Sequence, residues 1–279
     1  MNILNLINQG TFELKFNNIA TSKLDSEILL AKAIGKSREE ILIDYNKELN
    51  HKDICKFNEL ISRRKLKEPI AYILEEKEFW SKKFLVNKST LIPRPETELL
   101  VEELIKIYKD KSIKILDVGI GSGCILISLL SELKKSSGIG IDISHKALNI
   151  AKKNIKKHNL SEKIKLFKKS LSEIYQSKFD LIVSNPPYIE TRTMRNLDDD
   201  IRRYEPLIAL DGGNDGLDVI KKLIYKAKYI LKIRGKLALE IGNGQYTNVS
   251  KILRKNNFII KHKIRDYGNN IRCVVSRLY

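Results

Sequence analysis

Short apolar runs alternate with segments of helical periodicity over most of the chain after Leu99. Strand-length apolar runs bounded by breakers occupy residues 113–118, 138–142, 163–168, 179–184 and 236–241. Helical periodicity predicts helices over residues 99–108, 124–134, 145–158 and 215–231. This alternation predicts an α/β fold with a doubly wound, mostly parallel sheet. Two final strand-like runs, 258–265 and 271–277, are joined by a short turn, so they predict a hairpin and one antiparallel strand.

The first 75 residues contain only helix-like patterns, over 24–34, 38–43 and 53–64. Asp25 and Ser37 are predicted N-caps, and Gly35 is predicted to end the first of these helices. We therefore expect a small N-terminal helical domain at 1–75, a hairpin linker at 76–98 and a catalytic domain at 99–279. The helical domain carries no catalytic residues of its own, so it serves either as structural support or as a substrate-docking module.

The charge balance is strongly basic, with 52 Lys and Arg against 34 Asp and Glu and a formal net charge of +18. Such a surface favours partners bound to, or built from, RNA, although lysine pairs such as Lys152-Lys153 are typical of solvated helix faces. No apolar run reaches the ~18 residues that span a membrane, and the N-terminus lacks the pattern of a signal peptide. We expect a cytoplasmic monomer that contacts no membrane.

The cysteines and histidines show no metal-ligand spacing, so no metal is expected. Cys55, Cys124 and Cys273 lie in apolar periodic segments. They are therefore predicted to be reduced residues of the core, and not a disulfide framework.

A glycine-rich turn follows the predicted strand at 113–118. The segment Gly119-Ile120-Gly121-Ser122-Gly123 has the spacing GxGxG, and Cys124 stands where the third glycine of the dinucleotide fingerprint would fall. Glycines let a backbone approach a ligand closely. Asp142 ends the next strand, 23 residues after Gly119, at the spacing of an acid that binds a ribose diol. The turn therefore predicts a nucleoside site, and a triphosphate is disfavoured because no P-loop lysine follows.

The strand at 179–184 ends abruptly at Asn185-Pro186-Pro187-Tyr188. Neither proline can donate a ladder hydrogen bond, so the Asn185 side chain and the Pro186 carbonyl are expected at the carboxyl end of the strand, where open α/β sheets bind ligands. An amide oxygen and a nearby carbonyl can accept both hydrogens of one planar amino group, and Tyr188 can wall a flat substrate. The substrate group is therefore a carboxamide or the exocyclic amine of a base.

These motifs resemble those of a known superfamily. Asp117 and the glycines after it resemble motif I of the class I S-adenosylmethionine-dependent methyltransferases, and Asn-Pro-Pro-Tyr resembles the amino-group methyltransferases among them. A narrower resemblance rests on EPIA at 68–71, FW at 79–80, LIPRPETELLV at 91–101, SNPPYI at 184–189, EPLIALDGGNDGL at 205–217 and LEIGNG at 239–244. Together these segments resemble the protein-(glutamine-N5) methyltransferases of the PrmC/HemK type.

The resemblance implies an activity and a fold. Members methylate the glutamine amide of the Gly-Gly-Gln motif in class-I peptide chain release factors, which act in translation termination. The implied fold is a seven-stranded class I methyltransferase sheet with a small N-terminal helical domain. Release factors are thus the expected partners, S-adenosylmethionine is the expected cofactor, and no direct contact with DNA is expected.

The resemblance also implies roles for single residues. The turn Gly119–Gly123 would hold the methionine part of S-adenosylmethionine, and Asp142 its ribose. Catalysis and substrate binding would fall to Asn185, Pro186, Pro187 and Tyr188, with Asn185 also bordering the cofactor. The linker residues Arg94, Pro95 and Glu96 would help close the cofactor pocket; the alternative for Arg94 and Glu96 is a hinge salt bridge.

Two positions depart from the family pattern. Lys169 and Ser170 stand where the family has Asp-Trp beside the adenine, so Ser170 is expected to contribute there through its hydroxyl or backbone. Glu75 replaces a turn glycine, which matters only if its φ is positive. The acidic run 198–200 is expected to be a solvated loop or a helix start.

Two rival functions stay open. A DNA adenine-N6 methyltransferase also uses Asn-Pro-Pro-Tyr, although no target-recognition domain is evident here. The second rival is a non-enzymatic binding module that keeps a degenerate cofactor pocket. The departures at Lys169 and Ser170 favour this rival slightly.

Overall fold

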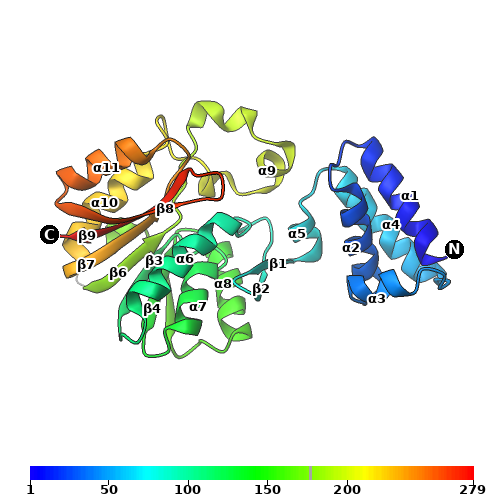
Figure 1. Cartoon of the computed structure of the whole chain (residues 1–279), viewed down its shortest axis with the longest axis horizontal. Helices are drawn as coiled ribbons and strands as arrows, with labels where there is room; N and C mark the ends of the chain where they lie inside the picture. Colours follow the sequence, from blue (N-terminus) through cyan, green and yellow to red (C-terminus); the bar gives the residue numbers. More distant parts are fainter. Residues whose placement is uncertain (176–177) are drawn as a thin grey trace. The chain divides into compact units, whose positions relative to one another are not determined.

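The computed structural model describes residues 1–175 and 178–279. The chain forms two compact units, which are described separately (Figure 1). One unit contains Met1–Glu75 together with Asp198–Tyr204, and the other contains Glu76–Leu197 and Glu205–Tyr279. The inclusion of residues 198–204 in the first unit is a feature that the sequence pattern did not predict.

The first unit is helical. Its elements are α1 (Ile3–Phe16), α2 (Ser22–Ile34), α3 (Arg38–Ile43), α4 (His51–Lys65), α5 (Ile70–Leu74) and, from the distant segment, α9 (Asp199–Tyr204). Helix α1 was not among the predicted ones. It buries Leu6 and Leu14 completely against a shared core that includes Leu30 of α2 and Phe57 of α4.

The helix ends test the predicted caps. Ser37 is confirmed as the N-cap of α3, where its hydroxyl accepts from the Glu40 N–H in a capping box. Gly35 is confirmed as the left-handed end of α2, with φ of 68°. The N-cap assigned to Asp25 is wrong, because α2 begins at Ser22. Asp25 is instead buried in its first turn and accepts a hydrogen bond from Arg64 Nε at 2.7 Å.

The second unit is built on one seven-stranded sheet. Its strands are β3 (Lys114–Val118), β4 (Ser137–Asp142), β5 (Ile164–Lys168), β6 (Phe179–Ser184), β7 (Leu231–Glu240), β8 (Phe258–Arg265) and β9 (Ile271–Leu278). Their order is β5-β4-β3-β6-β7-β9-β8, and β9 alone runs antiparallel to its neighbours β7 and β8. The predicted doubly wound α/β fold with one antiparallel strand is confirmed.

Helices cover both faces of this sheet (Figure 1). On one face an apolar cluster joins the sheet to α6 (Pro95–Tyr108), α7 (Cys124–Glu132) and α8 (His145–Lys157). On the other face a second cluster joins it to α10 (Asp218–Ile230) and α11 (Tyr246–Lys255). Because the chain turns from β3 toward β4 on one side and adds β6 on the other, a crevice is expected at the carboxyl ends of β3 and β6.

Several predicted boundaries were wrong. Helix α6 begins at Pro95 rather than Leu99, because a proline fits the first turn of a helix, where its missing N–H is not needed. Strand β7 begins at Leu231 rather than Lys236, so the preceding helix is shorter than predicted. The linker contains the expected hairpin, β1 (Glu76–Phe79) and β2 (Lys82–Leu85). The acidic run is confirmed as a helix start, since α9 begins at Asp199.

The free thiols differ in burial. Cys273 is buried as predicted and Cys124 is partly buried, but Cys55 is exposed, so its assignment to the core was wrong. Cys55 lies on the outer face of α4, one turn after His51, at 3.5 Å from the imidazole Nδ1. In the described residues, no helix is both long enough and apolar enough to cross a membrane.

Candidate active site

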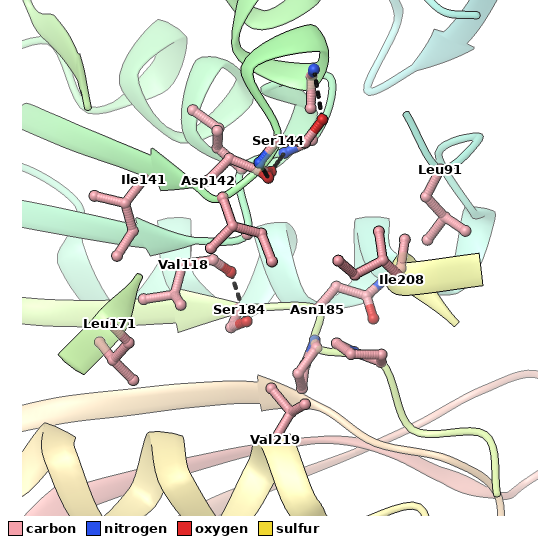
Figure 2. Close-up of a pocket in the computed structure, with 18 of the residues that line it drawn as sticks. Leu91, Val118, Ile141, Asp142, Ser144, Leu171, Ser184, Asn185, Ile208 and Val219 are labelled. Carbon is pink, nitrogen blue, oxygen red and sulfur yellow. Dashed lines mark hydrogen bonds between the residues drawn. The ribbon is translucent and has the colours of Figure 1, made fainter. Parts of the chain in front are cut away.

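A cavity of about 940 Å³ opens at the carboxyl ends of β3, β4 and β6. Its walls also include the segment before α6, the 3₁₀ turns η1 (Leu171–Glu173) and η3 (Leu207–Ala209), and one face of α10. Figure 2 shows Asp142 and Asn185 bordering this space at the ends of their strands, with Leu171, Ile208 and Val219 around it. The position matches the crevice expected from the strand order.

The glycine turn lines the cavity with backbone. Gly119 and Gly121 have φ of 72° and 55°, the left-handed region that favours glycine. A Cβ built on Gly119 would meet no atom within 4 Å, so open space lies beside this backbone. Gly123 does not line the cavity: it precedes α7 with φ of 86°, and a Cβ there would lie 3.0 Å from Ile127. Gly119, Ile120, Gly121 and Ser122 all belong to the lining.

Asp142 holds the turn in place. Its Oδ2 accepts from the Gly121 N–H at 3.0 Å, and its Oδ1 accepts from the Ser144 N–H at 2.8 Å (Figure 2). A carboxylate offers about four lone-pair positions, so two remain for the hydroxyls of a ribose. Asp142, the residue predicted to bind the ribose, therefore lies on the cavity wall and can still accept two further hydrogen bonds.

The region predicted for the adenine is polar on one side and apolar on the other. Lys169 and Ser170 line the cavity, but Ser170 is also the N-cap of η1: its N–H donates to Glu173 at 2.7 Å. Leu171 and Ile143, which sequence reasoning missed, supply apolar surface on the same wall. Aliphatic side chains thus line the cavity close to Ser170, the position at which the family has an aromatic residue. An apolar residue in the turn after β5 was the signal available for Leu171.

Asn185, Pro186 and Pro187 line the opposite part of the cavity. The Asn185 Nδ2 donates to Thr97 Oγ1 at 3.4 Å, and the Thr97 hydroxyl in turn donates to Glu240 Oε2 at 2.5 Å. Thr97 is 2 % exposed and Glu240 is fully buried. Burial raises the pKa of the Glu240 carboxyl, whereas the Thr97 hydrogen bond and the nearby Arg272 charge act in the opposite direction.

Tyr188 does not line the cavity. Its hydroxyl donates to Glu240 Oε1 at 3.3 Å and accepts from Arg272 at 3.1 Å. Its carbonyl accepts from the Gln245 Nε2 at 3.0 Å, and a Cβ on Gly212 would lie 2.8 Å from its Cα. The ring predicted to wall the substrate is thus outside the cavity lining, and its hydroxyl is held by Glu240 and Arg272.

Arg94 is the residue immediately before α6. It lines the cavity, and its guanidinium pairs with the buried Glu205 at 2.5 Å. Glu205 also accepts from the Ile92 N–H at 3.2 Å, so it fixes the segment that leads into α6. Pro95 and Glu96 are not part of the cavity lining.

Two further groups under the glycine turn are strongly affected by burial. Asp117 is 1 % exposed, its Oδ2 has no hydrogen-bond partner within residues 1–175 and 178–279, and burial raises its pKa to about 7. Burial also raises the pKa of the Cys124 thiol to about 12, so this thiol is not a nucleophile at neutral pH. Among the described residues, no group of three or more His, Cys, Asp or Glu side chains could hold a metal ion.

Family models match both units of the chain. The PrmC N-terminal domain matches residues 5–74, and the methyltransferase small domain matches residues 95–201. A release factor glutamine methyltransferase of Clostridium botulinum is 38 % identical over 283 residues, which is 100 % of both chains. The chain belongs to the release factor glutamine methyltransferase family. The resemblance found in the sequence is thereby confirmed.

Other relatives are longer, and solved structures support the fold. A bifunctional methyltransferase of Rickettsia bellii is 37 % identical over 98 % of this chain, but the chain spans only 54 % of that protein. A ribosomal protein L11 methylase from Lactobacillus delbrueckii subsp. bulgaricus is 24 % identical with a TM-score of 0.51, covering 67 % of this chain and 81 % of its own. This second likeness concerns the fold of the methyltransferase unit.

Proposed function

We propose that this protein transfers the methyl group of S-adenosylmethionine to the side-chain amide nitrogen of the glutamine in the Gly-Gly-Gln motif of class-I release factors. One observation carries the proposal. A single cavity is bordered by the glycine turn and Asp142 on one side and by Asn185 and Pro186 on the other. Family membership supports the same activity, and nothing in the comparisons supports a DNA adenine methyltransferase.

The lining fits the cofactor. Gly119 presents open backbone, Asp142 retains free acceptor positions, and Leu171 and Ile143 offer apolar surface. In this proposal the turn Gly119–Ser122 holds the methionine part, Asp142 the ribose, and the wall at Ser170 and Leu171 the adenine. Bound S-adenosylmethionine supplies a methyl group activated by its sulfonium.

The remaining chemistry is orientation. An amide nitrogen is a weak nucleophile because its lone pair is delocalised into the carbonyl. Asn185 Oδ1 and the Pro186 carbonyl accept the two N–H hydrogens and aim the lone pair at the methyl group, an effect that can lower a barrier by up to ~7–11 kcal/mol. The nitrogen–carbon bond forms as the sulfur–carbon bond breaks, and one N–H proton leaves to solvent.

The proposed partner is an intact release factor. Gly-Gly before the glutamine allows close backbone approach to the site. A short peptide must order its loop on binding, at roughly 1–2 kcal/mol per fixed residue, so it should be a poor substrate. The docking role of residues 1–75, the monomeric state and a cytoplasmic location remain predictions attached to this proposal.

Mass spectrometry of a purified release factor, incubated with enzyme and S-adenosylmethionine, tests the proposal. We expect one methyl group on the Gly-Gly-Gln glutamine, with the Asn185→Ala variant as the inactive control. Duplex DNA is the parallel substrate. Methyl incorporation into DNA with none into the release factor would overturn the proposal in favour of the adenine enzyme.

A further inference from the structure

A chain of buried hydrogen bonds ends at the Asn185 amide. It begins at Glu240, the last residue of β7, which is fully buried although it carries a carboxyl group. Glu240 accepts from Thr97 through one oxygen and from Tyr188 through the other, and Arg272 lies 4.0 Å away. The guanidinium and the two hydroxyls together compensate the buried charge.

The direction of these bonds follows from proton counting. A carboxylate can only accept, so the single hydroxyl proton of Thr97 points to Glu240. The Thr97 oxygen is then left as an acceptor, and only the NH2 side of the Asn185 amide can bond to it. The Asn185 Oδ1 consequently faces away from Thr97. In the described part of the chain this oxygen has no hydrogen-bond donor.

We infer that Glu240, acting through Thr97, fixes the orientation of the Asn185 amide so that its oxygen faces the substrate amino group. The inference rests on the proposed function. An Asn amide turned by 180° would present its own NH2 to the substrate NH2, and two donors cannot bond. Glu240 and Thr97 are therefore positioning residues: Glu240 acts through the Thr97 hydroxyl, and Thr97, which also borders the cavity, acts through the Asn185 amide.

The Glu240→Gln variant tests the direction of the hydrogen bonds from Asn185 through Thr97 to Glu240. Its side-chain NH2 can donate to Thr97, which frees the Thr97 proton to donate to Asn185 and favours the turned amide. We expect kcat to fall roughly 100-fold, as when one preorganised hydrogen-bonding group is lost from an active site. The dissociation constant for S-adenosylmethionine should stay unchanged. Thermal stability is not a suitable readout, because the substitution also leaves Arg272 without its carboxylate partner, so the variant is first shown to be folded by circular dichroism.

Two substitutions at Thr97 give an independent measurement. Thr97→Val keeps the shape of the side chain but removes its hydroxyl. Neither orientation of the Asn185 amide is then favoured, and kcat should fall about 10-fold. Thr97→Ser restores the hydroxyl and should restore kcat. Ser276→Ala is the matched control, because Ser276 is also buried, lies on the neighbouring strand and donates only to the Leu237 carbonyl. Its kcat should equal that of the wild type.

The outcomes separate this inference from the proposed function. A wild-type enzyme that leaves the release factor unmethylated contradicts the proposed function and removes the basis of the inference. A wild-type enzyme that is active, with Thr97→Val or a folded Glu240→Gln equally active, contradicts the inference alone. Loss of cofactor affinity in parallel with kcat also contradicts it, because the whole site would then be disturbed.

Discussion

The two ends of the cavity are built in different ways. The end formed by Gly119–Ser122 and Asp142 uses backbone N–H groups and one strand-end acid, and all of these lie within two consecutive βα turns. The end formed by Asn185 depends on Thr97 and Glu240, which are separated by 143 residues. The first end is a local motif, whereas the second exists only after the whole sheet has assembled.

This difference predicts that variants at the two ends affect different steps. Local contacts at the glycine turn should set cofactor affinity, and the assembled network at Asn185 should set the rate of transfer.

Asn185→Ala should give the largest change. It removes an acceptor from the substrate amide, and kcat should fall ~100- to 1000-fold, by analogy with the loss of one preorganised group at an active site. The affinity for S-adenosylmethionine, measured by calorimetry, should be nearly unchanged. Retention of most of the activity would remove Asn185 from the mechanism.

Asp117→Asn should stabilise the protein at alkaline pH. The folded-state pKa of Asp117 is raised to about 7, so folding favours its protonated form. The stabilisation is therefore complete below pH 3.8, the ordinary value, and is lost as pH rises toward 7. Asn cannot ionise, and the variant should unfold with a free energy higher by on the order of 2–4 kcal/mol at pH 8.

Urea unfolding of wild type and Asp117→Asn at several pH values gives the measurement. The difference in free energy of unfolding should shrink steadily as the pH is lowered toward 4. Equal stability at pH 8 would show that the Asp117 carboxylate is satisfied in the folded protein after all.

Asp142→Ala should weaken the binding of the cofactor and have little effect on the rate of transfer. Losing a charged hydrogen-bond partner costs about 1.5–3 kcal/mol, and the cofactor should be held more weakly by that amount. At saturating cofactor, kcat should change much less than it does in Asn185→Ala. An unchanged dissociation constant would show that Asp142 only stabilises the glycine turn and does not bind the cofactor.

Lys169→Asp should have the smallest effect. Lys169 borders the cavity, but the adjacent wall is made by the aliphatic Leu171 and Ile143. Cofactor affinity should stay within ~0.5 kcal/mol of the wild type or improve slightly, the usual range for a surface substitution. A loss of more than tenfold would give Lys169 a binding role of its own.

The sequence predicted the local end of the site well. Apolar runs bounded by glycine and proline defined β3, β4 and β6, and the residues at their ends lie on the cavity as expected. Periodicity failed at Leu231, because the end of α10 and the start of β7 are both apolar and tertiary packing decides between them. It also failed at α1, whose buried residues Ile3, Leu6, Ile7 and Leu14 recur at helical spacing.

The assembled end could not be predicted in the same way. Tyr188 was expected to face the substrate, but Glu240 and Arg272, on two other strands, hold its hydroxyl. Hydrogen bonds between residues so far apart in the sequence produce no recognisable local spacing of residue types. The signals that remained were an acid at the end of an apolar strand and the threonine within PRPETE. Glu75 is another feature that local sequence could not predict. Its φ of 59° lies in the left-handed region, so this position favours the glycine that Glu75 replaces.

The two N–H groups held by Asp142 have a kinetic consequence. Because Gly121 and Ser144 are already bonded to the carboxylate, the turn need not fold around an incoming cofactor. Association should then occur in one bimolecular step, with an observed rate that rises linearly with cofactor concentration in stopped-flow fluorescence and shows no plateau from a slow rearrangement. Substitutions in the glycine turn should then change the dissociation rate of the cofactor more than its association rate.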